Sequence, residues 1–153
     1  MKRLFVTLLL MACASSVSAA ESEVITAEVA NAADKKTTLH LELATTPEAR
    51  MHGLMNRKTL APNDGMAFFF PEISIEKFWM KNTLIPLDML FVDESGRIVY
   101  IATAIPLSLT PVGPDSPVET VIELAGGAAA KRGIAVGDKV HYEIPSAPSH
   151  MAR

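Results

Sequence analysis

The stretch Leu87-Asp88-Met89-Leu90-Phe91-Val92, followed by Asp93-Glu94-Ser95-Gly96 and then by residues 97–104, determines the fold class. A short apolar run, a four-residue polar segment that ends in glycine, and a second apolar run are typical of two antiparallel strands joined by a hairpin loop. The centre of the chain is therefore predicted to be a β-hairpin.

Further strand-like segments lie on both sides of this hairpin. Leu39, Leu41 and Leu43 point one way and His40 and Glu42 the other, which is the two-residue period of a strand. Apolar or alternating runs predict strands at residues 24–30, 37–44, 65–70, 78–80, 118–124 and 139–144. Pro71 is expected to end the strand at 65–70.

The helices are expected to be few and short. Thr45 or Thr46 can cap a first helix, Pro47 suits its first turn, and Gly53 can end it. A second helix of one or two turns is expected at residues 128–132, and the proline-rich residues 106–117 predict an extended loop. Many short strands with little helix predict a mainly β, single-domain β-sandwich or barrel-like fold.

The N-terminus carries an export signal. Lys2 and Arg3 precede an apolar run at residues 4–14 and then small residues up to Ala20, which is the plan of a secretory signal peptide. We therefore expect a signal peptide at 1–20, a β-rich domain at 21–144 and a flexible tail at 145–153, in a protein exported to the periplasm. No second run is long enough for a membrane span.

Cysteine and charge narrow the chemistry further. The single cysteine, Cys13, lies in the predicted signal peptide, so the exported domain has no thiol; a lipid anchor on Cys13 is the alternative to simple cleavage. Fourteen Lys and Arg against 17 Asp and Glu give a net charge of −3, which disfavours a nucleic-acid partner held by a broad basic surface. The four histidines have no metal-ligand spacing, and no cofactor is expected.

Several short sequence motifs follow one another along the chain in a characteristic order. They are Gly53-Leu54-Met55 with Arg57, Gly65-Met66 with Phe68 and Phe70, residues 78–83, Ile85-Pro86-Leu87-Asp88 with Phe91-Val92-Asp93, Val121-Ile122-Glu123-Leu124 with Gly127, Gly133-Ile134 and Gly137-Asp138. In that order and spacing, from residue 24 to residue 142, the chain resembles the domain-of-unknown-function family 192. The resemblance implies a compact β-sandwich-like fold and no established activity.

The candidate site centres on the predicted strand at residues 78–80 and the polar residues that follow it. Trp79 supplies an aromatic platform beside the polar side chains of Lys81 and Asn82, an arrangement that suits a sugar ring or a small polar ligand. Asp88, within the most apolar strand, either contacts that ligand or is an internal strut paired with Arg57, Lys81 or the backbone amides near Asn82. Arg57 and Glu123, the latter on the polar face of its strand, complete the predicted site at its rim.

The sequence leaves four functions open. The leading hypothesis is a non-catalytic module that binds a small polar or carbohydrate-like ligand at the cell envelope. The first alternative is an envelope hydrolase in which Asp88 and Glu123 converge as acid and base. The second is a protein-interaction module whose loop at 106–117 meets a partner. The third, a cuprous site, rests on thioethers at Met51, Met55, Met66, Met80 and Met89, which can equally be core gap fillers.

Overall fold

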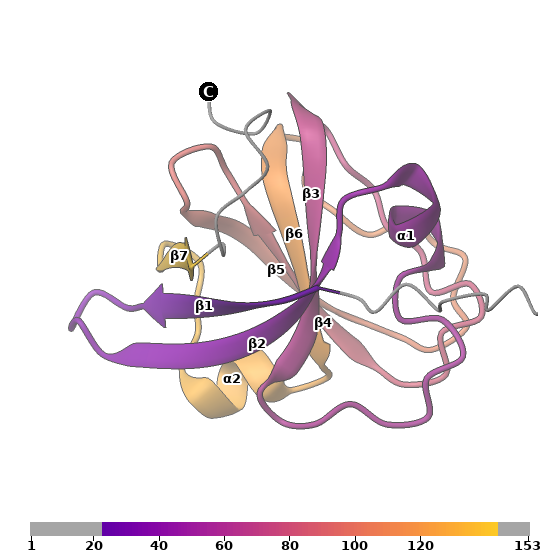
Figure 1. The fold of residues 1–153 in the computed structure, drawn as a ribbon, viewed down its shortest axis with the longest axis horizontal. Helices are drawn as coiled ribbons and strands as arrows, with labels where there is room; N and C mark the ends of the chain where they lie inside the picture. The colour runs from indigo at the N-terminus through magenta and orange to yellow at the C-terminus, as the bar shows by residue number, and fades with distance from the viewer. Residues whose placement is uncertain (1–22, 144–153) are drawn as a thin grey trace, which may run out of the picture.

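Seven strands form one strongly curled sheet in the order β5-β4-β6-β3-β2-β1-β7 (Figure 1). The computed structural model describes residues 23–143, so the predicted signal peptide, Cys13 and the tail at 145–153 lie outside the described residues. The mainly β prediction is confirmed. The elements are β1 (Val24–Ala30), β2 (Lys36–Ala44), α1 (Pro47–His52), β3 (Asp64–Ser74), β4 (Leu87–Val92), β5 (Ile98–Ala104), β6 (Val118–Ala125), α2 (Ala128–Arg132) and β7 (Lys139–Glu143).

The sheet curls until its two edge strands meet. Arg97, directly before β5, forms an isolated antiparallel bridge with Lys139 of β7. The backbone N–H of Val140 donates to the carbonyl of Gly96 at 2.8 Å. Gly96 has φ of 75°, and a Cβ there would lie 2.8 Å from the Val140 carbonyl oxygen. The hairpin glycine therefore permits the close approach that turns an open sheet into a barrel-like one.

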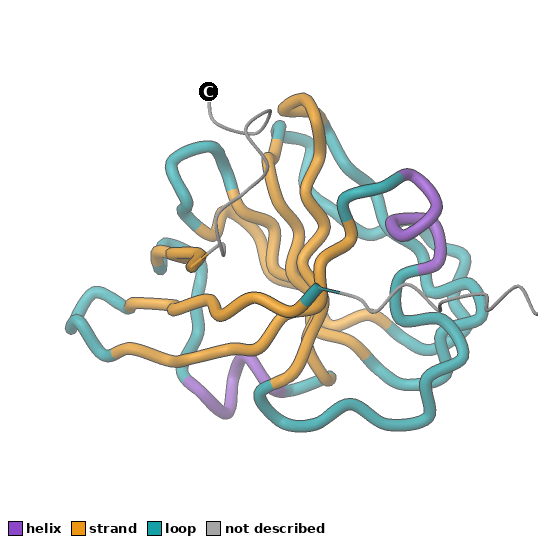
Figure 2. Tube along the Cα trace, in the orientation of Figure 1, coloured by secondary structure: helices purple, strands orange, loops and turns teal. Residues whose placement is uncertain are grey.

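Both faces of the central strands are buried. Along β4, Leu90 and Val92 pack inside the curl, whereas Met89 and Phe91 pack on its outer face. The inner core takes side chains from β1 to β7 and from α2. The outer core is covered by α1 and by loops that gather on one side of the sheet, as Figure 2 shows. Strands covered on both sides read as continuous apolar runs, which explains the composition of β4.

Two predicted boundaries are wrong. Residues 78–80 form no strand: Phe78 makes one isolated bridge with Val112, and the N–H of Thr83 turns back to the carbonyl of Met80 at 3.1 Å. Pro71 does not end β3, which continues to Ser74. The β3–β6 ladder is irregular between Phe69 and Ser74, so the missing proline N–H interrupts no regular pairing.

Helix α1 is built as its sequence predicts. The hydroxyl of Thr46 accepts a hydrogen bond from the N–H of Ala49 at 3.1 Å, and Pro47 occupies the first turn. The N–H of Gly53, in a positive-φ conformation, donates to the carbonyl of Ala49 at the helix end. This short helix brings Arg50, Met51 and His52 over the outer face of the sheet.

Asp88 ties β4 to its neighbours inside the barrel. Its side chain is 2% exposed, and its two carboxylate oxygens accept hydrogen bonds from the hydroxyl of Thr103 at 2.7 Å and from the N–H of Ala129 at 2.9 Å. The prediction that Asp88 pairs with Arg57, Lys81 or the backbone amides near Asn82 is wrong. Asp88 shares the inner face with Leu90, whereas those groups belong to loops over the outer face.

We predict that Asp88→Asn lowers the free energy of unfolding by about 1–3 kcal/mol, because an asparagine amide cannot accept both hydrogen bonds. Thr103→Val is the matched control, since it removes one donor and leaves the bond from Ala129. Urea denaturation measures both, and the loss in the Asp88 variant should exceed that in the Thr103 variant. Equal stability of the Asp88 variant and the wild type would contradict the structural role.

Candidate functional site

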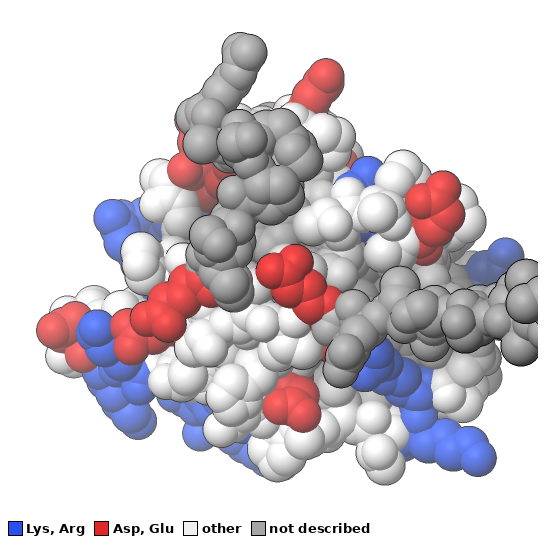
Figure 3. All heavy atoms as spheres, viewed as in Figure 1, with Lys and Arg blue, Asp and Glu red and all other residues white. Residues whose placement is uncertain are grey.

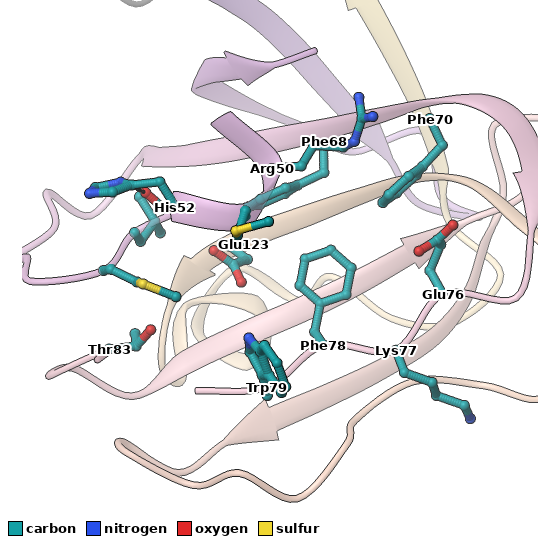
Figure 4. Close-up of a pocket in the computed structure, with 14 residues that line it drawn as sticks. Arg50, His52, Phe68, Phe70, Glu76, Lys77, Phe78, Trp79, Thr83 and Glu123 are labelled. Carbon is teal, nitrogen blue, oxygen red and sulfur yellow. Dashed lines mark hydrogen bonds between the residues drawn. The ribbon is translucent and has the colours of Figure 1, made fainter. Parts of the chain in front are cut away.

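A cavity of about 260 Å³ opens on the outer face of the sheet, between α1 and the segment around Phe78 (Figure 4). We call it the Glu123 cavity. Its wall combines aromatic, aliphatic and thioether side chains with a few polar ones. The residues that line it are Arg50, Met51, His52, Gly53, Leu54, Met55, Phe68, Phe70, Glu76, Lys77, Phe78, Trp79, Thr83 and Glu123.

The position of Glu123 follows from the period of β6. Ile122 and Leu124 pack in the inner core, so the residue between them must point to the outer face. There Glu123 lies opposite Met66 of β3 and Met89 of β4. The outer face was expected to be polar at this strand, but α1 and its following loop cover it, and Glu123 is only 5% exposed. Its carboxyl group points into the cavity (Figure 4).

The Glu123 carboxyl group has no hydrogen-bond or ion-pair partner among residues 23–143. Burial away from water penalises the charged form and raises the pKa of Glu123 to about 8. In the free protein at neutral pH the group is therefore predominantly a neutral acid. The oxygens of Glu123 face the cavity, whereas the fully enclosed side-chain oxygens without a partner within residues 23–143 are those of Thr120 and Tyr142.

The basic side chains at the cavity are engaged elsewhere. The guanidinium of Arg50 donates to the carbonyls of Thr45 at 2.6 Å and Phe69 at 3.0 Å. The ammonium of Lys77 bonds to Asp115 at 2.8 Å, and in Figure 4 it points away from the aromatic wall. Neither cation neutralises Glu123.

The aromatic wall is a packed array. The rings of Phe68 and Phe78 meet edge to face with centroids 5.0 Å apart, and Phe78 makes similar contacts with Phe70 and Phe91. Trp79 is 53% exposed and forms the outer part of the wall. Such interlocked rings hold a pocket in one shape before a ligand enters.

The structure separates the predicted site residues into different places. Trp79 lies between the Glu123 cavity and a shallow groove that it shares with Lys81, Asn82, Leu107 and Leu109. The ammonium of Lys81 lies 5.9 Å from the centroid of the Trp79 ring system. Trp79 is thus the one predicted residue common to both hollows.

Arg57 lines neither hollow. It forms a two-point ion pair with Glu42, with nitrogen–oxygen distances of 2.5 and 2.6 Å. That interaction raises the pKa of Arg57 and fixes the loop after α1 to β2.

The predicted convergence of Asp88 and Glu123 is wrong. Asp88 pairs with Leu124 across the β4–β6 ladder, so it shares the inner face with Leu124 while Glu123 points outward. The carboxylate that does share the cavity with Glu123 is Glu76, which accepts a hydrogen bond from Ser74 at 2.5 Å. Sequence reasoning did not find Glu76, Phe68 or Phe78 as wall residues. The alternation of Ile122 and Leu124 was the available signal for the outward direction of Glu123.

The methionines divide between wall and core. Met51 and Met55 line the cavity. Met66, Met80 and Met89 are buried in the outer core, where they fill space among Phe68, Phe91 and their neighbours. Within residues 23–143, no group of three His, Cys, Asp or Glu side chains is arranged to hold a metal ion.

The surface carries charges of both signs. On the face drawn in Figure 3, acidic side chains spread across the middle and top, and basic ones lie at the margins. No helix in the part of the chain that the structure describes is long and apolar enough to cross a membrane.

A family model described as Uncharacterized ACR matches residues 21–142. The chain belongs to the DUF192 family. The resemblance seen in the sequence is thereby confirmed, and the family brings no established activity. No curated protein matches the chain.

Two solved structures share both sequence and fold with this DUF192 chain. A candidate transcription regulator from Sinorhizobium meliloti 1021 is 36% identical, with a TM-score of 0.77, over 79% of this chain and 95% of that one. A protein of unknown function from Novosphingobium aromaticivorans DSM 12444 is 37% identical, with a TM-score of 0.74, over 77% of this chain and 84% of that one.

We predict that Glu123→Gln stabilises the protein increasingly as pH rises. The unfolded carboxyl group has a pKa near 4.5 and the folded one about 8, so the folded state holds the extra proton between these values. Stability of the wild type therefore falls as pH increases across this window, by at most about 1.4 kcal/mol per pH unit. The difference between variant and wild type should grow from pH 5 to pH 8 and level off above it.

Thermal or urea denaturation at a series of pH values measures this difference. Glu119→Gln is the control, because Glu119 is an exposed residue of the same strand. A stability difference for the Glu123 variant that stays constant from pH 5 to pH 8 would show that the carboxyl group is not held neutral.

Proposed function

We propose that this DUF192 protein is a non-catalytic binding module whose small polar ligand occupies the Glu123 cavity. The observation that carries the proposal is the buried carboxyl group of Glu123, which faces open space without a protein partner. Binding pockets combine apolar walls with a few convergent polar groups, and residues with strongly perturbed pKa values concentrate at functional sites. A ligand that pairs with Glu123 would offset the cost of its burial.

The proposed setting is the cell envelope. Its support is the N-terminal sequence, in which a basic start, an apolar run and small residues precede the domain. The Sinorhizobium meliloti relative is described as a candidate transcription regulator, but the charge of this chain does not favour binding to nucleic acid. A net charge of −3 and a mixed surface give no broad basic face for nucleic acid.

The protein-interaction hypothesis is the second candidate. Ile105, Leu107 and Leu109 are 73%, 60% and 64% exposed, and Leu107 and Leu109 line the groove beside Trp79. A row of exposed aliphatic side chains on a loop is typical of a surface that meets an apolar patch on a protein partner. The loop itself is held in place, since the N–H of Leu107 donates to the carbonyl of Thr83 at 3.1 Å.

A thermal-shift screen with sugars, amino acids, nucleotides, amines and cuprous ion tests the leading proposal. A ligand at about 100 times its dissociation constant stabilises the folded protein by about 2.7 kcal/mol, which shifts the melting temperature by several degrees. We expect Trp79→Ala to weaken the selective ligand at least about tenfold, because the cavity loses part of its wall.

The matched controls are Lys81→Ala and Leu109→Ala, which change the groove at residues that do not line the Glu123 cavity. A cavity ligand should be retained by both controls. A ligand lost equally in all three variants would place binding in the groove. No hit across the whole panel would contradict a small-molecule site.

A further inference from the structure

We propose that the ligand of the Glu123 cavity is an alkylated ammonium cation and that its binding expels the proton of Glu123. This inference rests on the proposed function and specifies the chemical class of its ligand. Four features of the cavity support it: the aromatic wall, the charge balance, the scarcity of hydrogen-bond acceptors and the size.

The wall presents aromatic faces and edges around the buried acid. Phe68, Phe78 and Trp79 all line the cavity with Glu123. Aromatic rings attract cations through the negative charge of their faces, most strongly for tryptophan, and this interaction strengthens when water is excluded. Cages of aromatic rings are a known way in which proteins recognise quaternary ammonium groups.

The charge balance of the cavity favours a cation. Glu123 and Glu76 both face it, whereas the cationic groups of Arg50 and Lys77 are held by backbone carbonyls and by Asp115. The ring of His52 lies at the rim, with its Nδ1 3.1 Å from the carbonyl oxygen of Gly53. The β3 and β4 residues opposite Glu123 are methionines and carry no charge. An entering cation would therefore meet a carboxyl group that neither Arg50 nor Lys77 contacts.

The cavity wall favours an ammonium group whose nitrogen carries alkyl substituents over a primary ammonium group. A primary ammonium has three N–H donors that need acceptors. Glu123 is the buried carboxyl acceptor here; the other side-chain oxygens of the wall are those of Glu76, one of which already accepts the hydroxyl of Ser74, and the hydroxyl of Thr83. The thioether and aliphatic side chains of Met51, Met55 and Leu54 accept little or nothing. N-methyl groups need no hydrogen bonds and pack against such a wall.

The volume sets the size of the ligand. At about 260 Å³ the cavity is smaller than the roughly 300–1,000 Å³ that holds drug-sized ligands. It therefore suits a small cation with its alkyl substituents.

Binding is then coupled to proton release. The neutral carboxyl group loses its proton to solvent, the carboxylate pairs with the cation, and no covalent bond changes. Because burial raises the pKa of Glu123 to about 8, one proton is released per ligand at neutral pH, and affinity increases with pH until the free carboxyl group is ionised.

Isothermal titration calorimetry of the exported domain with choline tests the inference, with 3,3-dimethyl-1-butanol as the neutral probe of the same shape. We expect choline to bind at least about tenfold more tightly than the neutral alcohol at pH 8.5, and about 25-fold more tightly at pH 8.5 than at pH 6.5, in proportion to the ionised fraction of a carboxyl group with a pKa of about 8. Titrations in two buffers of different ionisation enthalpy should show close to one proton released per choline at pH 6.5.

Three variants make the test specific. Glu123→Gln should abolish both the preference for choline and its pH dependence, while retaining the folded state. His52→Gln tests the other titratable side chain at the rim: the pH dependence should persist whatever happens to the affinity, because the proton comes from Glu123. Lys81→Ala should keep both the preference and the pH dependence, because Lys81 lines the neighbouring groove.

The outcomes separate this inference from the proposed function. Equal binding of choline and the alcohol, or choline affinity that does not change with pH, would overturn the inference. A Trp79-dependent neutral ligand from the screen, with no binding of choline, would overturn it and leave the binding module intact. If neither choline nor any compound of the screen binds, both the inference and the proposed binding function are overturned.

Discussion

The rest of the structure depends on one constraint in β6: this strand lies between the inner and the outer core, and its successive side chains point alternately into one and the other. Ile122 and Leu124 are required inside the barrel, so Glu123 must point outward. If water reached this outer face, a carboxylate there would keep its hydration and its burial would cost no free energy. Instead α1 and the loops of the outer core cover it, and Glu123, opposite Met66 and Met89, is only 5% exposed as a residue.

The same alternation gives the two buried acids different tasks. Asp88 faces the barrel interior, where the hydroxyl of Thr103 and the N–H of Ala129 satisfy its two oxygens. Glu123 faces an open cavity with no protein donor among residues 23–143. A satisfied buried carboxylate fixes strands to a helix, whereas an unsatisfied one at a cavity is available to a ligand. The contrast explains why Asp88 and Glu123 do not form the acid–base pair of the hydrolase alternative.

Much of the fold could be predicted from local sequence. The hairpin around Gly96, the Thr46 cap and the strand alternation of Leu39 and Leu41 are each encoded by residues close together in the chain, and the structure confirms them. The failures involve contacts over long sequence distances. Residues 78–80 look like a strand because they are apolar, but they are apolar because they cover the outer core.

The site was harder to predict than the fold for the same reason. Trp79 and Glu123 were recognised from their residue types, yet the cavity that joins them also needs α1 and Phe68, which are distant in sequence. The polarity of the outer face of β6 was misjudged, since alternation shows where a side chain points and not what covers it. Arg57 was predicted as a partner of Asp88 and a rim residue of the site, whereas its guanidinium forms an ion pair with Glu42.

The account depends most on the neutral state of Glu123 in the free protein. Carbon-13 NMR of the side-chain carboxyl groups, followed through a pH titration, reports the ionisation of that residue directly, with Glu123→Gln used to assign its signal. The account predicts a midpoint near 8. A midpoint near 4.5, the value of an ordinary glutamate, would mean that water or an unrecognised donor reaches the carboxyl group, and would contradict the central claim.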